Sequence, residues 1–510
     1  MPTQHPDSLE PHPMGQQSLA EHAIHGLFHV NLHGDEAKSA EDELKSLAQA
    51  VEAMTIGGVV ERLGLPTPQA AQEAALWARS DGKGLALDDF YPHVRQILGA
   101  KPDGADVCIV FNQQALACQA LSQVLGGKAR LWRVPFGAAA QKRCGQTFVD
   151  LQFDKARLYI FRTGVVILDW CWHYVGKDLP AAVALEANYA LSHGNYATKV
   201  QTSQDGEPQV INAQTLLAMA QALLPPQWAD KASLQPGRRT LYSLVKLQHP
   251  AEEEELRTLA LWFSHRQTTD YRPKPQSTEG GLLQPFPYLV HALVSEGGAS
   301  VIAPADMASS FVDNFVPGTG ANTYLPLYLA SLHNHLWLLA QTEVLPSKAS
   351  SGKRHEVRDL EELYERTVEF RRYFYFPMIS QISLHNAFYQ RSQDVLKIAE
   401  RQRFLEQTTH DIAELLKARR TRWIGRISGA VAGFLLSHEL LDILSQSGLP
   451  GSMPNLRVWF VETANATPAE LEPLVRLVER WDLAVFFGSL AGALLGYWAA
   501  WFFDRTPKAE

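Results

Sequence analysis

The sequence predicts an α-rich chain in three parts: an α/β cytoplasmic head, a long α-helical stalk and a C-terminal membrane hairpin of two helices. Three observations predict this fold class. They are a β-branched hairpin signal near residue 160, a stretch from 378 to 422 without proline or glycine, and two apolar runs near the C-terminus. At 510 residues the chain is also too long for a single compact core.

The composition excludes several classes of protein. Hydrophobic residues make up 46% of the chain and charged residues 20%, which is a globular balance. A net charge of −8 argues against nucleic acid as a partner. The four cysteines include no CxxC pair, so neither a disulfide scaffold nor a zinc ribbon is expected. The first residues lack the basic and apolar segments of a secretory signal.

The N-terminal part is predicted from its composition. Residues 1–18 are rich in proline, histidine and glutamine, so we expect a disordered tail. Alanine-rich apolar patterns predict a mainly helical region over 19–129. Histidines at four positions could share one helical face as metal ligands, whereas the same stretch also alternates like a strand; they are His22, His25, His29 and His33. In either case we expect a solvated polar face, and the identity of any metal stays unknown.

Residues 130–345 carry the α/β pattern of the head. Strands are predicted at Thr147–Phe153, Arg157–Arg162 and Val165–Trp172. The last two are joined at Thr163-Gly164, which is typical of a hairpin. Apolar periodicity and helix punctuation predict helices at Pro180–Gly194, Ala213–Leu224, Glu252–Phe263 and Tyr324–Thr342.

Residues 356–422 are predicted to form the stalk helices. One helix is expected over Glu356–Phe376, and a longer one begins at Met378 after Pro377. Apolar residues recur along it in a heptad-like seam. If this helix continues to Leu444, it reaches about 100 Å at 1.5 Å per residue.

Two apolar runs predict the membrane hairpin. The second, 483–503, holds 21 residues without a charge, which matches the thickness of a bilayer core. The first, 423–444, has a shorter charge-free stretch, so an interfacial helix is its alternative. Basic residues lie at the start of the first run and after the end of the second, so in a hairpin they would lie on the same side of the membrane. They predict a multi-pass inner-membrane protein with an external connection at 445–482 and a cytoplasmic tail at 504–510.

Small residues recur every four positions in both runs. Such stripes let helices approach closely, and they predict packing of the spans and a homo-oligomer. The six glycines are Gly425, Gly429, Gly433, Gly488, Gly492 and Gly496.

This arrangement resembles the CorA superfamily of divalent-cation channels, over about Arg130 to Asp504. The resemblance implies a pentameric cation channel gated by its head, with a divalent cation such as Mg²⁺ as permeant or regulatory ion. The Gly-Met-Asn motif of that family is not intact here, because other residues separate Gly451, Met453 and Asn455. CorA-like proteins with large heads also resemble membrane effectors of bacterial antiviral systems. The alternatives are therefore a nucleotide-triggered, membrane-permeabilising effector and a non-conducting membrane tether.

The candidate site residues follow from this interpretation. In an oligomer, either His438 with Asp442 or Glu439 would line the pore, since they lie on different faces, and Ser437 would line it otherwise. Four further residues could bind an anionic ligand, although ordinary surface residues are the simpler reading; they are Arg238, Arg239, His265 and Arg266. No nucleophile elbow, HExxH or paired-carboxylate motif is present, so we do not expect an enzyme.

Overall fold

A computed structural model describes most of the chain. The described residues are 17–32, 40–64, 72–80, 88–98, 107–125, 131–193, 209–229, 240–271, 282–286, 289–294, 297–305, 314–349, 355–446, 487–488 and 490–498. The chain divides into two compact units, Met1–Glu406 and Gln407–Glu510.

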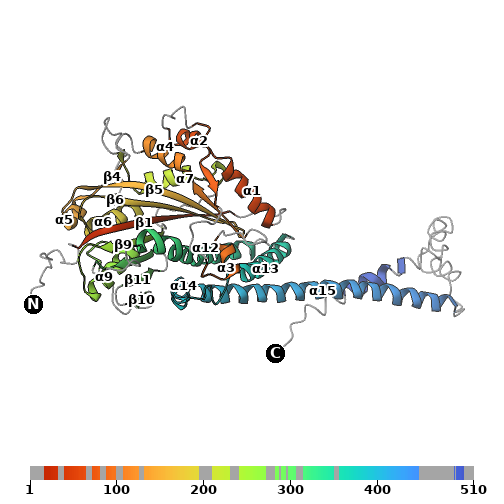
Figure 1. Ribbon diagram of the computed structural model, residues 1–510. Helices are drawn as coiled ribbons and strands as arrows, with labels where there is room; N and C mark the ends of the chain where they lie inside the picture. The colour runs from red at the N-terminus through yellow and green to blue at the C-terminus, as the bar shows by residue number, and fades with distance from the viewer. Residues whose placement is uncertain are drawn as a thin grey trace, which may run out of the picture. The chain divides into compact units, whose positions relative to one another are not determined.

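The first unit is built on one large mixed sheet (Figure 1). Its main path runs β10-β11-β12-β9-β1-β6-β5-β3-β2, with β7 beside β1, β4 beside β5, and β8 beside β4. Neighbouring strands are antiparallel except in the pairs β9–β12 and β4–β8. The strands are β1 (Ser18–Asn31), β2 (Trp77–Arg79), β3 (Cys108–Gln113), β4 (Trp132–Pro135), β5 (Phe148–Phe161), β6 (Val165–Val175), β7 (Leu179–Pro180), β8 (Gln209–Val210), β9 (Thr240–Leu247), β10 (Leu282–Phe286), β11 (Leu289–Val294) and β12 (Gly298–Ala303).

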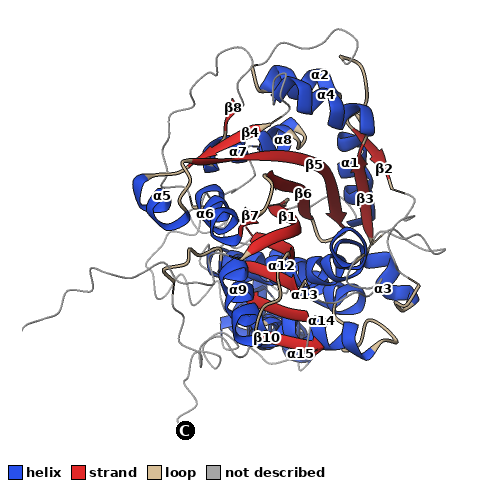
Figure 2. Ribbon diagram, turned by 60° about the vertical axis from the view of Figure 1, so that its left-hand side comes forward, coloured by secondary structure: helices blue, strands red, loops and turns tan. Residues whose placement is uncertain are grey.

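Helices cover both faces of this sheet (Figure 2). The main apolar core lies on one face, beneath α1 (Ala40–Glu52), α2 (Ile56–Arg62), α4 (Ala115–Leu125), α6 (Ala181–Ser192), α7 (Ala213–Ala222) and α9 (Glu253–His265). The other face is covered by η5 (Phe315–Tyr324) and α12 (Leu325–Ala349), against which α13 (His355–Phe374) and α14 (Ser383–Val395) pack. Shorter helices are α3 (Pro92–Ile97), α5 (Ala138–Cys144) and α8 (Pro226–Ala229).

The predicted hairpin is confirmed in β5 and β6. Its turn needs glycine, because Gly164 has a φ of +80° and a Cβ there would overlap the carbonyl oxygen of Leu32. The amide of Leu32 in turn donates to the carbonyl oxygen of Gly164 at 2.8 Å. The turn therefore also fixes the end of β1 beside β6. The predicted helices of the head are observed as α6, α7, α9 and α12; their ends shift by at most two residues, except that α12 continues to Ala349 instead of ending at Thr342.

The sheet is larger than the sequence predicted. Residues 19–129, expected to be mainly helical, contribute β1, β2 and β3 as well as helices. Strand β1 lies in the middle of the sheet, between β6 and β9. The strand-like alternation noted for the stretch with His22, His25 and His29 is therefore the alternative that the structure confirms.

The predicted long helix from Met378 to Leu444 is interrupted. Helix α14 ends before Leu396, and α15 (Ile398–Gln446) begins after Lys397. Lys397 has a φ of +54°, a left-handed conformation that no helix interior accommodates. What remains is a helix of 49 residues, which is about 74 Å long.

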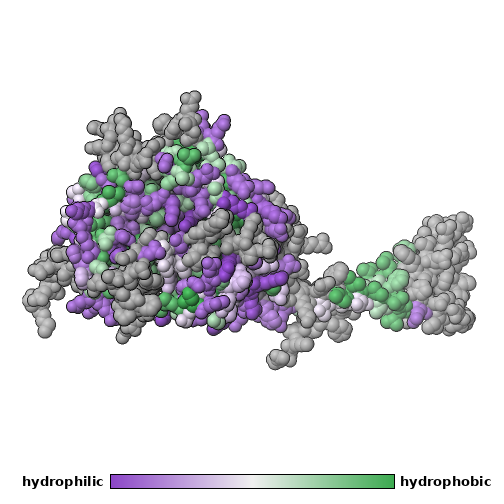
Figure 3. Space-filling view, in the orientation of Figure 1, coloured by the Kyte–Doolittle hydropathy of each residue, from purple (hydrophilic) through white to green (hydrophobic). Residues whose placement is uncertain are grey.

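The second unit pairs α15 with the helical residues 490–498 through glycines. A Cβ on Gly433 would overlap the carbonyl oxygen of Gly492, and one on Gly496 would overlap that of Gly429. These backbones therefore approach more closely than any larger residue allows. Figure 3 shows apolar side chains, in green, over the C-terminal part of α15, and the exposed ones include Ile424, Val431, Leu435 and Leu436.

The membrane prediction is wrong. Within the part of the chain that the structure describes, no helix combines the length and the apolar character needed to span a bilayer. Residues 423–444 belong to α15, where Arg426, His438, Glu439 and Asp442 leave only about 16 Å of helix without an ionisable residue. In the other predicted span, 483–503, only 487–488 and 490–498 are described.

This finding also overturns the conclusions drawn from the spans. They are the C-terminal membrane hairpin as part of the fold class, the multi-pass inner-membrane localisation, and the CorA-like cation channel. The antiviral membrane effector and the membrane tether depend on the same spans and lose their basis as well. For the run 423–444 the physical reason is the distribution of charge, because a helix that carries ionisable groups at membrane depth pays a large cost on a lipid-facing surface.

Candidate functional site

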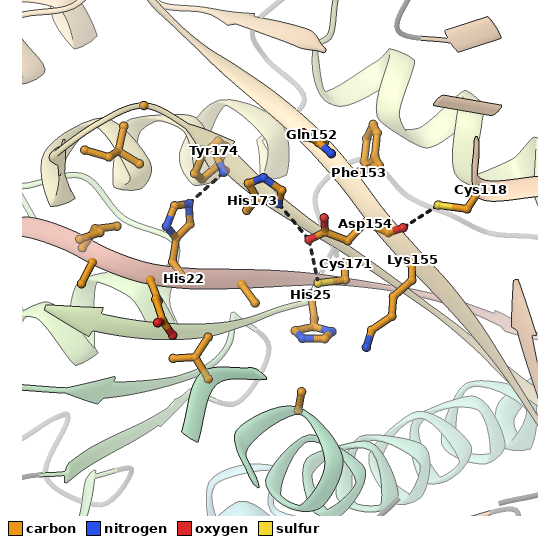
Figure 4. A pocket seen from close by; sticks show the side chains of 18 of the residues that line it. His22, His25, Cys118, Gln152, Phe153, Asp154, Lys155, Cys171, His173 and Tyr174 are labelled. Carbon is orange, nitrogen blue, oxygen red and sulfur yellow. Dashed lines mark hydrogen bonds and ion pairs between the residues drawn. The ribbon is translucent and has the colours of Figure 1, made fainter. Parts of the chain in front are cut away.

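A pocket of about 700 Å³ is lined by residues of β1, β5 and β6 and by two residues of η5. We call it the strand pocket, because its polar wall comes from three adjacent strands, β1, β5 and β6. Val316 and Ala321 of η5 also contribute to its lining. Figure 4 shows the side chains that concern its chemistry, which are His22, His25, Asp154, Lys155, Cys171 and His173.

Strand register places these side chains together. In the antiparallel ladders Lys155 lies opposite Cys171, and Cys171 lies opposite His25. Directly opposed residues share one face of a sheet, so these three form a row across β5, β6 and β1. Asp169 and His173, two residues before and after Cys171, emerge on the same face of β6.

Asp154 enters the pocket because β5 has a bulge. The register between β5 and β6 shifts between Phe153 and Lys155, so Asp154 is an extra residue at this point. Its Oδ2 atom accepts a hydrogen bond from Nδ1 of His173 at 3.0 Å. This hydrogen bond, together with the charge of Asp154, raises the pKa of His173 although partial burial opposes it.

His25 and Asp169 form a buried ion pair beside the pocket. Nδ1 of His25 donates to Oδ1 of Asp169 at 2.8 Å, and the two residues are 1% and 3% exposed. Burial by itself lowers the pKa of His25, but the neighbouring Cys171 and Asp169 outweigh burial and raise it to about 10. His25 is therefore a cation at neutral pH, and both of its ring nitrogens carry hydrogen.

His22 is neutral, in contrast to His25. Its Nε2 atom accepts a hydrogen bond from the backbone N–H of Tyr174 at 2.9 Å, so that nitrogen carries no proton. Burial and the nearby His173 lower the pKa of His22 to about 4, against the opposing charge of Asp154. The pocket thus holds histidines in different protonation states, which is the pattern of sites that separate proton donors from acceptors.

Two thiols complete the polar wall. The Sγ atom of Cys118 donates to the backbone oxygen of Asp154 at 2.6 Å, and that of Cys171 donates to Oδ2 of Asp154 at 3.9 Å. Both cysteines are free thiols. Asp154 is consequently held from three directions, by two cysteines and His173.

The predicted histidine cluster is not assembled as a metal site. Figure 4 shows the rings of His22 and His25 on opposite sides of β1, as expected for residues three apart in a strand. Within the described residues, no group of three or more ligating side chains could hold a metal ion. His33 lies outside the described residues. The expectation of a solvated polar face is wrong for His25, which is buried.

The other predicted site residues lie elsewhere or outside the described residues. Ser437 donates to the carbonyl oxygen of Phe434 and faces Gly492, while Glu439 is exposed. His438 and Asp442 belong to α15. Residues outside the description are Gly451, Met453, Asn455, Arg238 and Arg239.

Two of the predicted anion-binding residues end helix α9 and are not part of the strand pocket. Nδ1 of His265 donates to the carbonyl oxygen of Leu261 at 2.8 Å. Arg266 caps the helix in a left-handed conformation with a φ of +55°. Among the predicted packing glycines, Gly429, Gly433, Gly492 and Gly496 come together, whereas Gly425 has open space around its Cβ position.

Asp154, Asp169, Cys171 and His173 were not predicted from the sequence. A signal was present in the segment DWCWHY, where Asp169, Cys171 and His173 alternate with aromatic residues in a strand. Alternating ionisable residues share one face of a strand. On a strand covered on both sides, such a polar row is costly unless it is paired or binds something.

No protein-family model, curated protein or solved structure matches the chain. These comparisons therefore give no support to the resemblance to the CorA superfamily. The predicted homo-oligomer, lipid bilayer and nucleotide partners are tested by no finding and stay predictions.

Proposed function

We propose that the protein is a small-molecule-binding protein whose strand pocket accepts a compact polar ligand. The observation that carries this proposal is the wall of ionisable side chains held in fixed positions, above all the Asp154–His173 pair, around a pocket of about 700 Å³. Ligand pockets in proteins commonly have volumes of about 300–1,000 Å³ and a few precisely placed polar groups.

The arrangement of these side chains favours a ligand-binding role over a purely structural one. Asp154 is the extra residue of a β-bulge in β5, and it lines the pocket. Bulges are frequent next to binding sites. Nδ1 of the neutral His22 ring and the ring of His25 offer hydrogen-bond donors, since Nε2 of His22 already accepts from Tyr174, while the carboxylate of Asp154 offers an acceptor. A ligand with groups of both kinds would meet fixed partners without a large rearrangement.

Thermal-shift and ligand-observed NMR screening of the full chain tests this function. The panel contains amino acids, dicarboxylates, sugar phosphates, mononucleotides and cyclic dinucleotides, so it also tests the predicted nucleotide partner. We expect at least one class to bind, and Asp154→Asn or His173→Gln to weaken it at least tenfold. Glu254→Gln on the exposed start of α9 is the control. Binding that is unchanged in both pocket variants, or no binding at all, would contradict the proposal.

Acid–base catalysis on the bound ligand is a second candidate. The specific observation is that Asp154 holds His173 through Nδ1, the arrangement by which a carboxylate orients a general base. The other ring nitrogen, Nε2, could then exchange a proton with the ligand. Incubation of the wild-type protein with a panel ligand should yield product, whereas His173→Gln should lower turnover more than it lowers binding. An unchanged ligand after long incubation would reject catalysis and leave binding intact.

A further inference from the structure

One buried hydrogen-bond donor beside the strand pocket has no partner in the protein. Nε2 of His25 is buried and makes no hydrogen bond, while Nδ1 of the same ring donates to Asp169. The side chain is 1% exposed, yet it lines the pocket. Buried polar atoms nearly always have a partner, so an unpaired one at a pocket wall needs an explanation such as a ligand.

The geometry determines which nitrogens of the His25 ring act as hydrogen-bond donors. The carboxylate of Asp169 can only accept, so Nδ1 of His25 carries a proton. When the ring is cationic, Nε2 carries one as well and requires an acceptor. Lys155, which lines the same pocket, can donate but not accept.

Lys155 and His25 lie on the same side of the sheet. Both are opposed to Cys171, one from β5 and one from β1. Figure 4 shows the amine of Lys155 and the ring of His25 extending in the same direction from their strands. Two outer strands of a triplet are about 10 Å apart, a distance that a long lysine side chain and a small ligand group can bridge.

We infer that the strand pocket binds an oxyanion of its ligand, a carboxylate or phosphate group, between Nε2 of His25 and the ammonium group of Lys155. This inference rests on the proposed function and names the class of ligand. The anion accepts a hydrogen bond from His25 and compensates the charge of Lys155.

The acidic residues of the pocket do not occupy this position. Asp154 already accepts from His173 and Cys171, and Asp169 accepts from Nδ1 of His25. Glu21 lines the pocket too, but it lies four residues before His25, about 13 Å along β1. Among the residues that the structure describes, no carboxylate accepts a hydrogen bond from Nε2 of His25.

Histidine-selective ¹⁵N NMR of the full chain tests the inference, with acetate and inorganic phosphate as probes. The Nε2 resonance of His25 is identified by its loss in His25→Gln. We expect saturable shifts of this resonance with both anions and none with acetamide, the uncharged analogue of acetate. Lys155→Met should raise the apparent Kd at least tenfold, whereas Lys142→Met should leave it within twofold. Lys142 is a matched control because it is an exposed lysine on α5, outside the pocket.

Two results would overturn the inference. One is an equal response of His25 to acetate and acetamide, or no response, which means that water satisfies Nε2. The other is equal affinity in Lys155→Met and Lys142→Met, two surface variants that do not depend on the folding of His25→Gln. If a panel compound binds through Asp154 and His173 while the anions leave His25 unchanged, the anion site is rejected and the proposed function stands. If neither binds, both are rejected.

Discussion

His25 on β1 and Asp169 on β6 form an ion pair in which Nδ1 of the imidazole lies 2.8 Å from Oδ1 of the carboxylate. The pairing of Cys171 with His25 and of Asp169 with Leu27 sets the two residues diagonally across the ladder. Residues so placed can touch only if their side chains lean toward each other along the strands. The pair thereby links β1, the first strand in the sequence, to the β5–β6 hairpin beside it in the sheet.

We expect Asp169→Asn to lower the free energy of unfolding by about 3–5 kcal/mol, because the variant leaves the buried imidazolium without its counter-ion. Urea unfolding monitored by tryptophan fluorescence measures this loss. The control is Glu41→Gln, which removes the exposed pair with Lys45 and should cost about 0.5 kcal/mol or less. Equal effects of the two variants would contradict a buried ion pair.

The same pair gives a pH dependence. The folded pKa of His25, about 10, lies above the ordinary value of 6.5. Its stabilisation is therefore fully present below pH 6.5 and is lost as the pH rises through about 10. The difference in unfolding midpoint between the wild type and His25→Gln should shrink over this window. A difference that stays constant from pH 6.5 to 10 would show that His25 is not a cation in the folded protein.

Buried His333 should lower the stability of the protein at acidic pH, where His25 stabilises it. Its Nε2 atom is 2.8 Å from the hydroxyl of Thr163, its ring stacks on Phe161, and burial lowers its pKa to about 3. Unfolding releases this histidine to a pKa near 6.5, so stability is intact above pH 6.5 and falls below it by roughly 1.4 kcal/mol per pH unit. His333→Gln should flatten this slope, whereas His410→Gln, at an exposed position of α15, should not. The pH dependence of the thermal midpoint between pH 4 and 7 decides this.

Gly26 and Trp172 should couple energetically. A Cβ on Gly26 would overlap the indole ring of Trp172, which is fully buried. Gly26→Ala should therefore cost about 1–3 kcal/mol through overpacking. The same change in a Trp172→Leu background should cost much less, and a double-mutant cycle by urea unfolding gives the coupling. Additive effects would mean that the sheet relaxes around the new methyl group.

Alanine substitutions at different glycines of the second unit should have different effects on the pairing of its helices. A Cβ on Gly433 meets the backbone of Gly492, while one on Gly425 meets nothing within 4 Å. We expect Gly433→Ala to speed amide exchange in residues 490–498 about tenfold or more, since a steric cost of about 1–3 kcal/mol weakens the pairing. Gly425→Ala should leave exchange there unchanged and favour α15 slightly, because alanine is the better helix former. Similar exchange in both variants would contradict the close helix pairing.

Local patterns determined part of this structure from the sequence alone. The β5–β6 hairpin follows from β-branched residues around Thr163-Gly164, because the turn depends on a few adjacent residues and on one left-handed glycine. The helices α6, α7 and α9 follow from their apolar periodicity and their end residues in the same way. The break at Lys397 was not predictable, since no proline or glycine marks it and the carbonyl oxygen of Leu396 there accepts a hydrogen bond from Nδ1 of the distant His335 at 3.2 Å.

The strand pocket was decided by tertiary structure. His25 and Asp169 are 144 residues apart, and Asp154 enters the site through a bulge whose position no local pattern marks. Whether a histidine is solvated, neutral or a buried cation depends on what the opposite strands present to it. The membrane prediction failed within the described residues, where the charges of α15 divide the apolar run at 423–444. Short-range sterics fix hairpins and helix ends, whereas burial and charge pairing come from residues that only the folded chain brings together.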